Sequence, residues 1–122
     1  MRIDHTALYV HNLQAARDFF VCYLNASANN GYHNPTTGLR TYFLTFEDGA
    51  RLELMSRPGI AARGSEQPQT GYSHLAFATG SRESVDSLTA RLRTDGYEVL
   101  SGPRVTGDGY YESCVLGPDG CQ

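Results

Sequence analysis

The sequence contains no lysine and no tryptophan, and neither sign of charge dominates it. Ten arginines face 13 Asp and Glu residues in a chain of 122, which leaves a formal net charge of −3. The arginines form no basic stripe of the kind that neutralises a phosphate backbone. Apolar runs are also short, because none approaches the ~18 residues of a membrane span. We therefore expect a soluble protein without a nucleic-acid or membrane partner.

Cysteine is scarce as well. The chain has three cysteines, Cys22, Cys114 and Cys121, and an odd number cannot all pair within one chain. None of them stands in a CxxC motif, so we expect neither a cysteine metal site nor a redox motif. Met1 is not followed by the charged and then apolar leader of an exported protein. These features predict reduced thiols and a cytoplasmic location.

Familiar catalytic motifs are absent too, and an internal repeat stands in their place. There is no GxGxxG, no P-loop and no GxSxG elbow, which excludes the common nucleotide and acyl-transfer sites. Residues 3–8 and 72–77 instead match at an offset of 69, with His5 answered by His74. Two turn tripeptides ending in Asp-Gly match at an offset of 71. A repeated unit of about 60 residues buries too little surface alone, so we predict one domain over residues 1–122.

The first half of the chain has the order strand, helix, strands. It predicts a strand at residues 2–10, a helix capped by Asn12, a weak strand within 27–33, and strands at 41–46 and 51–56. Asp48-Gly49 suits a tight hairpin between the last two. Module one then covers about residues 1–57. The Pro, Gly, Ser and Gln-rich stretch at about 58–71 reads as a linker.

The second half, module two at about residues 72–122, repeats this order. It predicts a strand at 72–79, a helix from Ser81 to a stop at Gly96, strands at 97–100 and 110–116, and a turn at 118–120. One more strand should follow that turn, but the sequence ends at Gln122. Applying the offset of 71 residues to Glu53 gives position 124, so the last strand looks truncated.

Strand alternation groups the candidate ligands on equivalent faces. His5 and His74 share parity with neighbours that point away from the predicted helices, and Glu53 stands between Leu52 and Leu54, which should face the helix. Two imidazoles and a carboxylate that converge on a cavity suit a borderline divalent ion such as Zn, Ni, Co or Fe. A histidine on a strand is also commonly a satisfied or exposed polar residue, and a symmetric relic that no longer binds metal stays open.

Other polar and aromatic residues have simpler interpretations. His11 and His33 are expected to be solvated loop residues, and Asp48 and Asp119 to be turn formers. Glu112 receives no role. An aromatic pocket is a weaker interpretation than ordinary packing for the tyrosines at positions 9, 42, 72, 110 and 111.

The chain resembles the vicinal oxygen chelate superfamily, in particular glyoxalase I-like proteins. The resemblance is carried by residues 3–8, the helix from Asn12-Leu13 to Phe19-Phe20, the Leu52-Glu53-Leu54 strand, residues 71–77 and residues 118–120. It implies an α+β fold of two tandem βαβββ modules that form a curved, barrel-like mixed sheet with a metal cleft. It also implies a homodimer, often with sites shared between subunits.

The resemblance further implies a site and a reaction. One divalent ion, Ni or Zn first and Co, Fe or Mn next, would be held by His5, Glu53 and His74, with the fourth family ligand falling at position 124. In the family that last carboxylate is also the general base, so Glu53 is the catalytic carboxylate that this sequence offers. The reaction would isomerise a thiol hemithioacetal of methylglyoxal, or act on a related small carbonyl compound.

Substrate and function class keep alternatives at this stage. Glutathione-dependent bacterial members place an arginine where this chain has Tyr9, and nothing selects a substitute among Arg40, Arg51 and Arg57. Extradiol dioxygenases and fosfomycin-modifying relatives use a His, His, Glu set without a ligand at position 53. Bleomycin-resistance members sequester ligands without metal and generally lack these residues.

Overall fold

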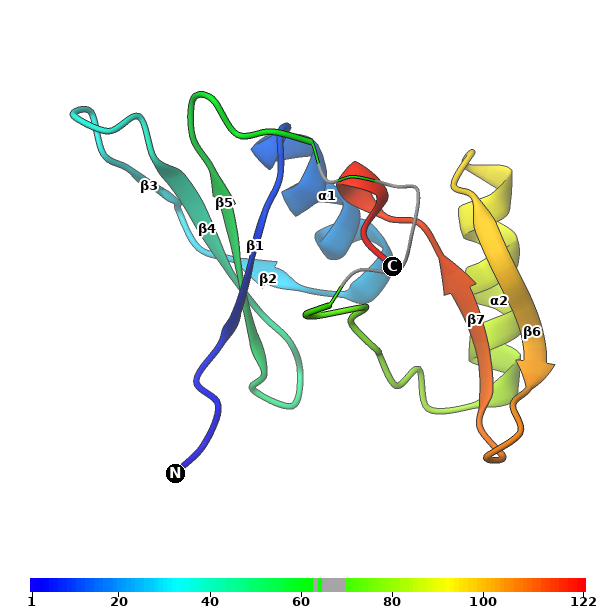
Figure 1. Cartoon of the computed structure of the whole chain (residues 1–122). Coiled ribbons are helices and arrows are strands. Elements are labelled where there is room, and N and C mark those ends of the chain that lie inside the picture. The colour runs from blue at the N-terminus through cyan, green and yellow to red at the C-terminus, as the bar shows by residue number, and fades with distance from the viewer. Residues whose placement is uncertain (63, 65–69) are drawn as a thin grey trace. The chain divides into compact units, whose positions relative to one another are not determined.

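Over the described part of the chain, two α-helices and two sheets form the fold, which confirms the predicted α+β class. The computed structural model describes residues 1–62, 64 and 70–122. The chain divides into two compact units, unit 1 at Met1–Arg63 and unit 2 at Gly64–Gln122 (Figure 1). Residues 63 and 65–69 of the predicted linker lie outside the described residues. The single domain over residues 1–122 and the barrel-like tandem modules stay predictions.

Unit 1 is built on a five-stranded sheet with the strand order β1-β5-β4-β2, and β3 also pairs with β4. Its elements are β1 Thr6–Tyr9, α1 Leu13–Leu24, β2 Ser27–Ala28, β3 Tyr32–His33, β4 Arg40–Thr45 and β5 Arg51–Ser56. β1 runs parallel to β5, and the other pairs are antiparallel. The blue helix α1 in Figure 1 packs against β4 and β5. The strands and the helix predicted for the first half are confirmed.

Helix α1 forms where the sequence predicts it because both of its ends are capped. The side-chain oxygen of Asn12 accepts a hydrogen bond from the backbone N of Ala15 at 3.0 Å. Asn25 ends the helix in the left-handed conformation, with φ 53°. The apolar side of α1 is buried with the facing side chains of the sheet, at Ala16, Phe19, Phe20, Leu44, Leu52 and Leu54. Full burial of a Leu or Phe side chain stabilises a fold by roughly 1.5–3 kcal/mol, so the core of unit 1 lies here.

The hairpin between β4 and β5 fixes the register of the sheet. Asp48 accepts a hydrogen bond from the backbone N of Ala50 at 2.9 Å, and Gly49 takes φ 85°. Asp48 is thus the turn former that the sequence predicts. In the resulting register Phe43 lies opposite Glu53.

Unit 2 consists of α2 Arg82–Thr94, β6 Val99–Val105, β7 Tyr111–Val115 and the short 3-10 helix η1 Pro118–Gly120. The strands β6 and β7 form a two-stranded antiparallel sheet, and α2 packs against both. Ser81 caps the start of α2, because its side chain accepts a hydrogen bond from Ser84 N at 3.1 Å. Gly96, with φ 92°, stops the helix as predicted.

The predicted strand at residues 72–79 is wrong, because these residues form no strand. In unit 1 the first strand is held by the last strand of the unit, β5. In unit 2 the backbone N of Leu75 donates to the carbonyl of Gln122 at 3.0 Å, but residues 72–79 join no ladder among the described residues. A strand exists only where a neighbour pairs with its backbone. The alternating pattern at 72–79 lacks such a neighbour along most of its length.

Candidate metal centre

Glu53 lies on the face of the unit 1 sheet that α1 does not cover. Its neighbours Leu52 and Leu54 are 3% and 0% exposed and point into the core. Alternation along β5 turns the carboxylate to the opposite side, where its side chain keeps 17% exposure. The predicted facing of Leu52, Glu53 and Leu54 is confirmed.

His5 reaches the same face from the adjacent strand. It precedes β1, in which Ala7 lies opposite Glu53 in parallel register. The His5 side chain is 37% exposed, and its Nε2 lies 3.7 Å from Oε2 of Glu53. The ring also packs edge-on against Phe43, with the ring centroids 5.2 Å apart. The structure therefore brings His5 and Glu53 together, as the shared parity predicts.

The geometry of this pair fits two ligands of one divalent ion. Two donors each about 2.1 Å from a tetrahedral zinc ion lie about 3.4 Å apart, whereas an N–H···O hydrogen bond spans about 2.7–3.2 Å. The observed 3.7 Å is nearer to the first separation. Among the described residues no group donates a hydrogen bond to the Glu53 carboxylate. A mostly buried carboxylate needs a compensating partner, and a cation held between Glu53 and His5 would supply one.

Two more side chains extend the site: Asp4, for which the sequence predicted no role, and Arg51, which it left as one of three candidate arginines. Oδ2 of Asp4 lies 2.9 Å from Nδ1 of His5 and accepts a hydrogen bond from Arg51 at 3.1 Å. The hydrogen bond from His5 and the charge of Arg51 lower the pKa of Asp4 below its ordinary value. Strict alternation would place Asp4 on the face opposite His5, but Asp4 precedes β1 and its carboxylate reaches the His5 ring. Their adjacency in the sequence was the available signal.

His74 belongs to unit 2 and is exposed, in the segment that forms no strand. The His5–Glu53 pair belongs to unit 1. No group of three or more His, Cys, Asp or Glu side chains placed to hold a metal ion occurs among residues 1–62, 64 and 70–122. The third predicted ligand therefore stays a prediction.

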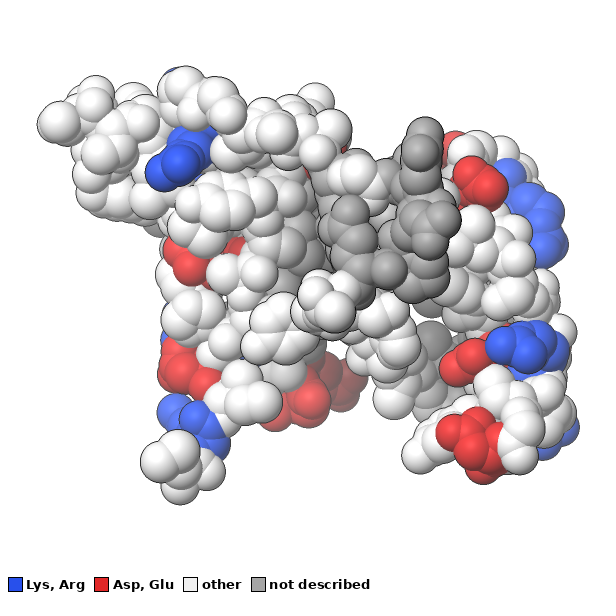
Figure 2. Space-filling view, in the orientation of Figure 1, with Lys and Arg blue, Asp and Glu red and all other residues white. Residues whose placement is uncertain are grey.

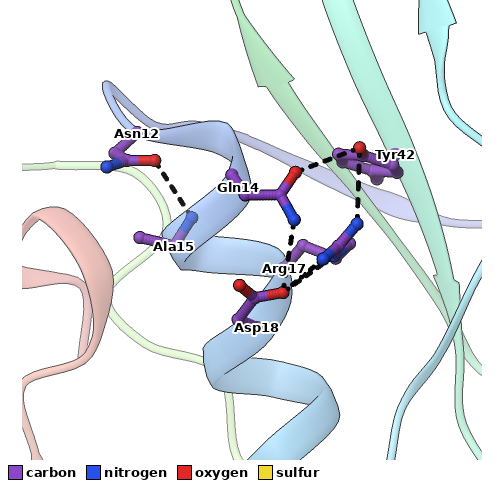
Figure 3. A network of polar contacts seen from close by, with 6 residues as sticks. All are labelled: Asn12, Gln14, Ala15, Arg17, Asp18 and Tyr42. Atoms are coloured by element: carbon purple, nitrogen blue, oxygen red, sulfur yellow. Dashed lines mark hydrogen bonds and ion pairs between the residues drawn. The ribbon is translucent and has the colours of Figure 1, made fainter.

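A hollow of about 470 Å³ lies on the helix side of the unit 1 sheet. It is lined by His11, Asn12, Leu13, Gln14, Arg40, Tyr42 and Ser56. Two of these residues belong to the polar network in Figure 3, in which the Gln14 amide and the Tyr42 hydroxyl are hydrogen-bonded at 3.3 Å and Arg17 donates to that hydroxyl at 3.5 Å. Tyr42 pairs with buried Leu54, so this hollow and the His5–Glu53 pair lie on opposite faces of one sheet.

The remaining polar residues that the sequence analysis considered lie outside the His5–Glu53 pair. His11 and His33 are exposed, and Glu112 lies 3.7 Å from Arg104 in an ion pair. Asp119 takes φ 54° within η1, as a turn residue does. The three cysteines form no disulfide within the described chain.

The surface charges and the helix lengths can be described for each part of the structure. On the face drawn in Figure 2, acidic and basic side chains stand interspersed over each unit. No helix among the described residues has the length and apolarity needed to cross a bilayer.

Several known proteins are similar to this chain in sequence or in fold. The uncharacterized protein YqjT of Bacillus subtilis is 29% identical over 125 residues, covering 96% of this chain and 91% of that protein. A glyoxalase family protein from Enterococcus faecalis has a similar structure, with TM-score 0.81, 27% identity and coverage of 98% and 92% of the two chains. The fosfomycin resistance protein FosX of Listeria monocytogenes, complexed with Mn(II), shares the fold at TM-score 0.62 and 24% identity, over 85% and 77% of the chains.

A family model covers almost the whole sequence. The model described as Glyoxalase/Bleomycin resistance protein/Dioxygenase superfamily matches residues 2–122. The motifs at His5, Glu53 and His74 predict the same superfamily. The chain therefore belongs to the Glyoxalase/Bleomycin resistance protein/Dioxygenase superfamily, the vicinal oxygen chelate proteins.

Proposed function

We propose that this protein is a metal-dependent lyase or isomerase of the glyoxalase I type, acting on a hemithioacetal of methylglyoxal or a related small carbonyl compound. The observation that carries the proposal is the His5–Glu53 pair, whose donor atoms lie 3.7 Å apart on the face that α1 leaves open. Membership of a superfamily that includes enzymes supports it.

The proposed site is a divalent-ion site. His5 holds the ion through Nε2 and Glu53 through its carboxylate, and His74 is the third ligand by its equivalence with His5 in the sequence repeat. Nickel or zinc suits an imidazole and carboxylate set best, with cobalt, iron or manganese next. FosX, with Mn(II) on the same fold, supports a divalent ion. A bound ion would supply Lewis-acid polarisation of the substrate carbonyl.

In this proposal Glu53 is also the general base. Its carboxylate takes up the proton from the carbon that carries sulfur and hydroxyl and returns it to the neighbouring carbonyl carbon, while the hydroxyl proton moves to the oxygen of that carbonyl. The substrate's atoms are conserved, and a thioester is formed. Proton transfer by a positioned carboxylate contributes about 10²–10⁴-fold in rate. Phe43, which packs against His5, gives the reacting end of the substrate an apolar neighbour.

The proposal includes the assembly that the resemblance implies. Two chains form a homodimer in this proposal. The substrate is a small molecule that carries a thiol adduct, and the protein works in the cytoplasm.

The test compares metal content and turnover in the same preparations. Wild type, His5→Ala and Glu53→Gln are loaded with nickel or zinc and assayed on hemithioacetals of several thiols. Both variants should lose metal and turnover together. Glu47→Gln removes an exposed carboxylate from the β4–β5 turn, outside the His5–Glu53 pair, and should keep both.

Two results would contradict the proposal. A metal-free sequestering protein of the bleomycin-resistance kind would take up no metal, and its ligand affinity would survive His5→Ala. A dioxygenase or a fosfomycin-modifying enzyme would keep its metal in Glu53→Gln, because those relatives need no ligand at position 53.

A further inference from the structure

The two nitrogens of the His5 ring face different carboxylates. Nδ1 lies 2.9 Å from Oδ2 of Asp4, and Nε2 lies 3.7 Å from Oε2 of Glu53. An ionised carboxylate only accepts hydrogen bonds. The short contact therefore requires the proton of a neutral ring to sit on Nδ1. The lone pair is then on Nε2, the nitrogen that faces Glu53.

Asp4 is itself held in place by a closed ring of contacts. Oδ2 of Asp4 accepts a hydrogen bond from Arg51 at 3.1 Å, and the Arg51 guanidinium lies over the Phe43 ring at 4.4 Å from its centroid. Phe43 packs edge-on against His5 at 5.2 Å, which closes the ring back to Asp4. Each of the four side chains contacts two others. The His5 ring is thus fixed through both its edge and its Nδ1.

We propose that Asp4 is a positioning residue for His5, which it holds in the Nδ1–H tautomer so that the Nε2 lone pair stands beside Glu53. The purpose of this arrangement rests on the proposed function, in which Nε2 binds a divalent ion. Carboxylates that accept the second ring hydrogen of a metal-binding histidine fix its tautomer and orientation, and their loss typically costs 10–100-fold in metal affinity. A surface ion pair without this role would leave both tautomer and affinity unchanged.

The first readout needs no metal. Nitrogen NMR of the imidazoles in the metal-free protein, at a pH well above the ordinary histidine pKa of about 6.5, reports which ring nitrogen carries the proton. Wild type should show His5 mainly as the Nδ1–H form. Asp4→Ala should move it toward the Nε2–H form that free histidine prefers, and Asp4→Asn should lie between them.

The second readout is zinc affinity, measured by competition with a chelating dye. Asp4→Ala should bind zinc about 10–100-fold more weakly than wild type. Glu47→Ala is the matched control, because it removes the same charge from an exposed position of unit 1 and should change neither readout. Asp4 is exposed, with 55% of its side chain accessible, so its removal should leave the fold intact.

The two readouts separate this inference from the proposed function. An unchanged tautomer in Asp4→Ala, or zinc affinity equal to wild type, overturns the role of Asp4 while leaving the metal enzyme standing. A tautomer shift in a protein that binds no zinc in any form supports the positioning of His5 by Asp4 and contradicts the metal function.

Discussion

The two halves of this chain carry the same sequence pattern, but unit 1 forms more of the predicted strands and buries more apolar side chains than unit 2. Unit 1 has a five-stranded sheet and eight buried apolar residues, Val10, Ala16, Phe19, Phe20, Ala26, Leu44, Leu52 and Leu54. Among the described residues of unit 2, a two-stranded sheet accompanies two buried side chains, Thr89 and Leu92. Tyr72, on the segment that forms no strand, is 90% exposed.

This difference indicates that the first strand of a unit forms only where the last strand of the unit pairs with it. In unit 1 β5 pairs with β1 and also supplies Leu52 and Leu54 to the core. The same strand carries Glu53 to the face where His5 lies. The core, the first strand and the candidate ligand pair of unit 1 therefore depend on one element, β5.

The largest expected effect on stability comes from truncating one buried leucine in the core of each unit. Leu54→Ala removes a fully buried side chain and should lower the free energy of unfolding by about 2–5 kcal/mol. Leu92→Ala, at 5% exposure in a thinner core, should cost less, near the lower end of that range. Urea denaturation gives the loss, and hydrogen exchange assigns it to a unit. An equal or larger loss for Leu92→Ala would contradict the difference between the cores.

The ends of the two helices should give the next largest effect. Gly96 follows α2 at φ 92°, and the backbone N atoms of Gly96 and Tyr97 donate to Arg93 and Leu92 at 3.1 and 2.9 Å. Gly96→Ala forces a side chain into the left-handed region and should cost about 1–2 kcal/mol. The matched change in unit 1 is Asn25→Gly, at φ 53°, which should stay within about 0.5 kcal/mol of wild type. Thermal unfolding of both variants checks this, and a harmless Gly96→Ala would show that the helix end relaxes.

The smallest expected effect is a pH dependence confined to unit 2. The Tyr111 hydroxyl donates to Asp86 at 2.7 Å, and this hydrogen bond to the carboxylate raises the Tyr111 pKa above its ordinary value. A raised folded pKa means that the stabilisation is complete below the unfolded pKa of about 10 and is lost as pH rises through the folded pKa. Asp86→Asn should bring the Tyr111 pKa down toward its ordinary value.

Absorbance titration of the tyrosines measures this shift, with Tyr111→Phe identifying which part of the signal belongs to Tyr111. Identical Tyr111 titrations in wild type and Asp86→Asn would contradict the assigned cause.

The sequence was a good guide wherever local chemistry decides the structure. The caps at Asn12 and Ser81, the stop at Gly96 and the turn at Asp48 are local hydrogen-bonding features, and each was found where expected. Alternation along a paired strand likewise placed Glu53 correctly.

Prediction failed where a distant partner or a strand boundary decides. The strand at residues 72–79 needed a neighbour that its own alternation does not reveal. The sequence predicted no role for Asp4, which precedes the paired strand that begins at Thr6. The ligand pair was predictable from parity, whereas the contacts that orient His5 follow from the tertiary placement of Arg51 and Phe43.

The most direct test of the central claim is metal content per chain, measured by elemental mass spectrometry on wild type and Glu53→Gln purified without a metal-affinity tag. We predict about one nickel, zinc, cobalt, iron or manganese ion per wild-type chain, and a clear loss of bound metal in Glu53→Gln. A wild-type protein that holds no such ion, and takes up none when these ions are added, would contradict it.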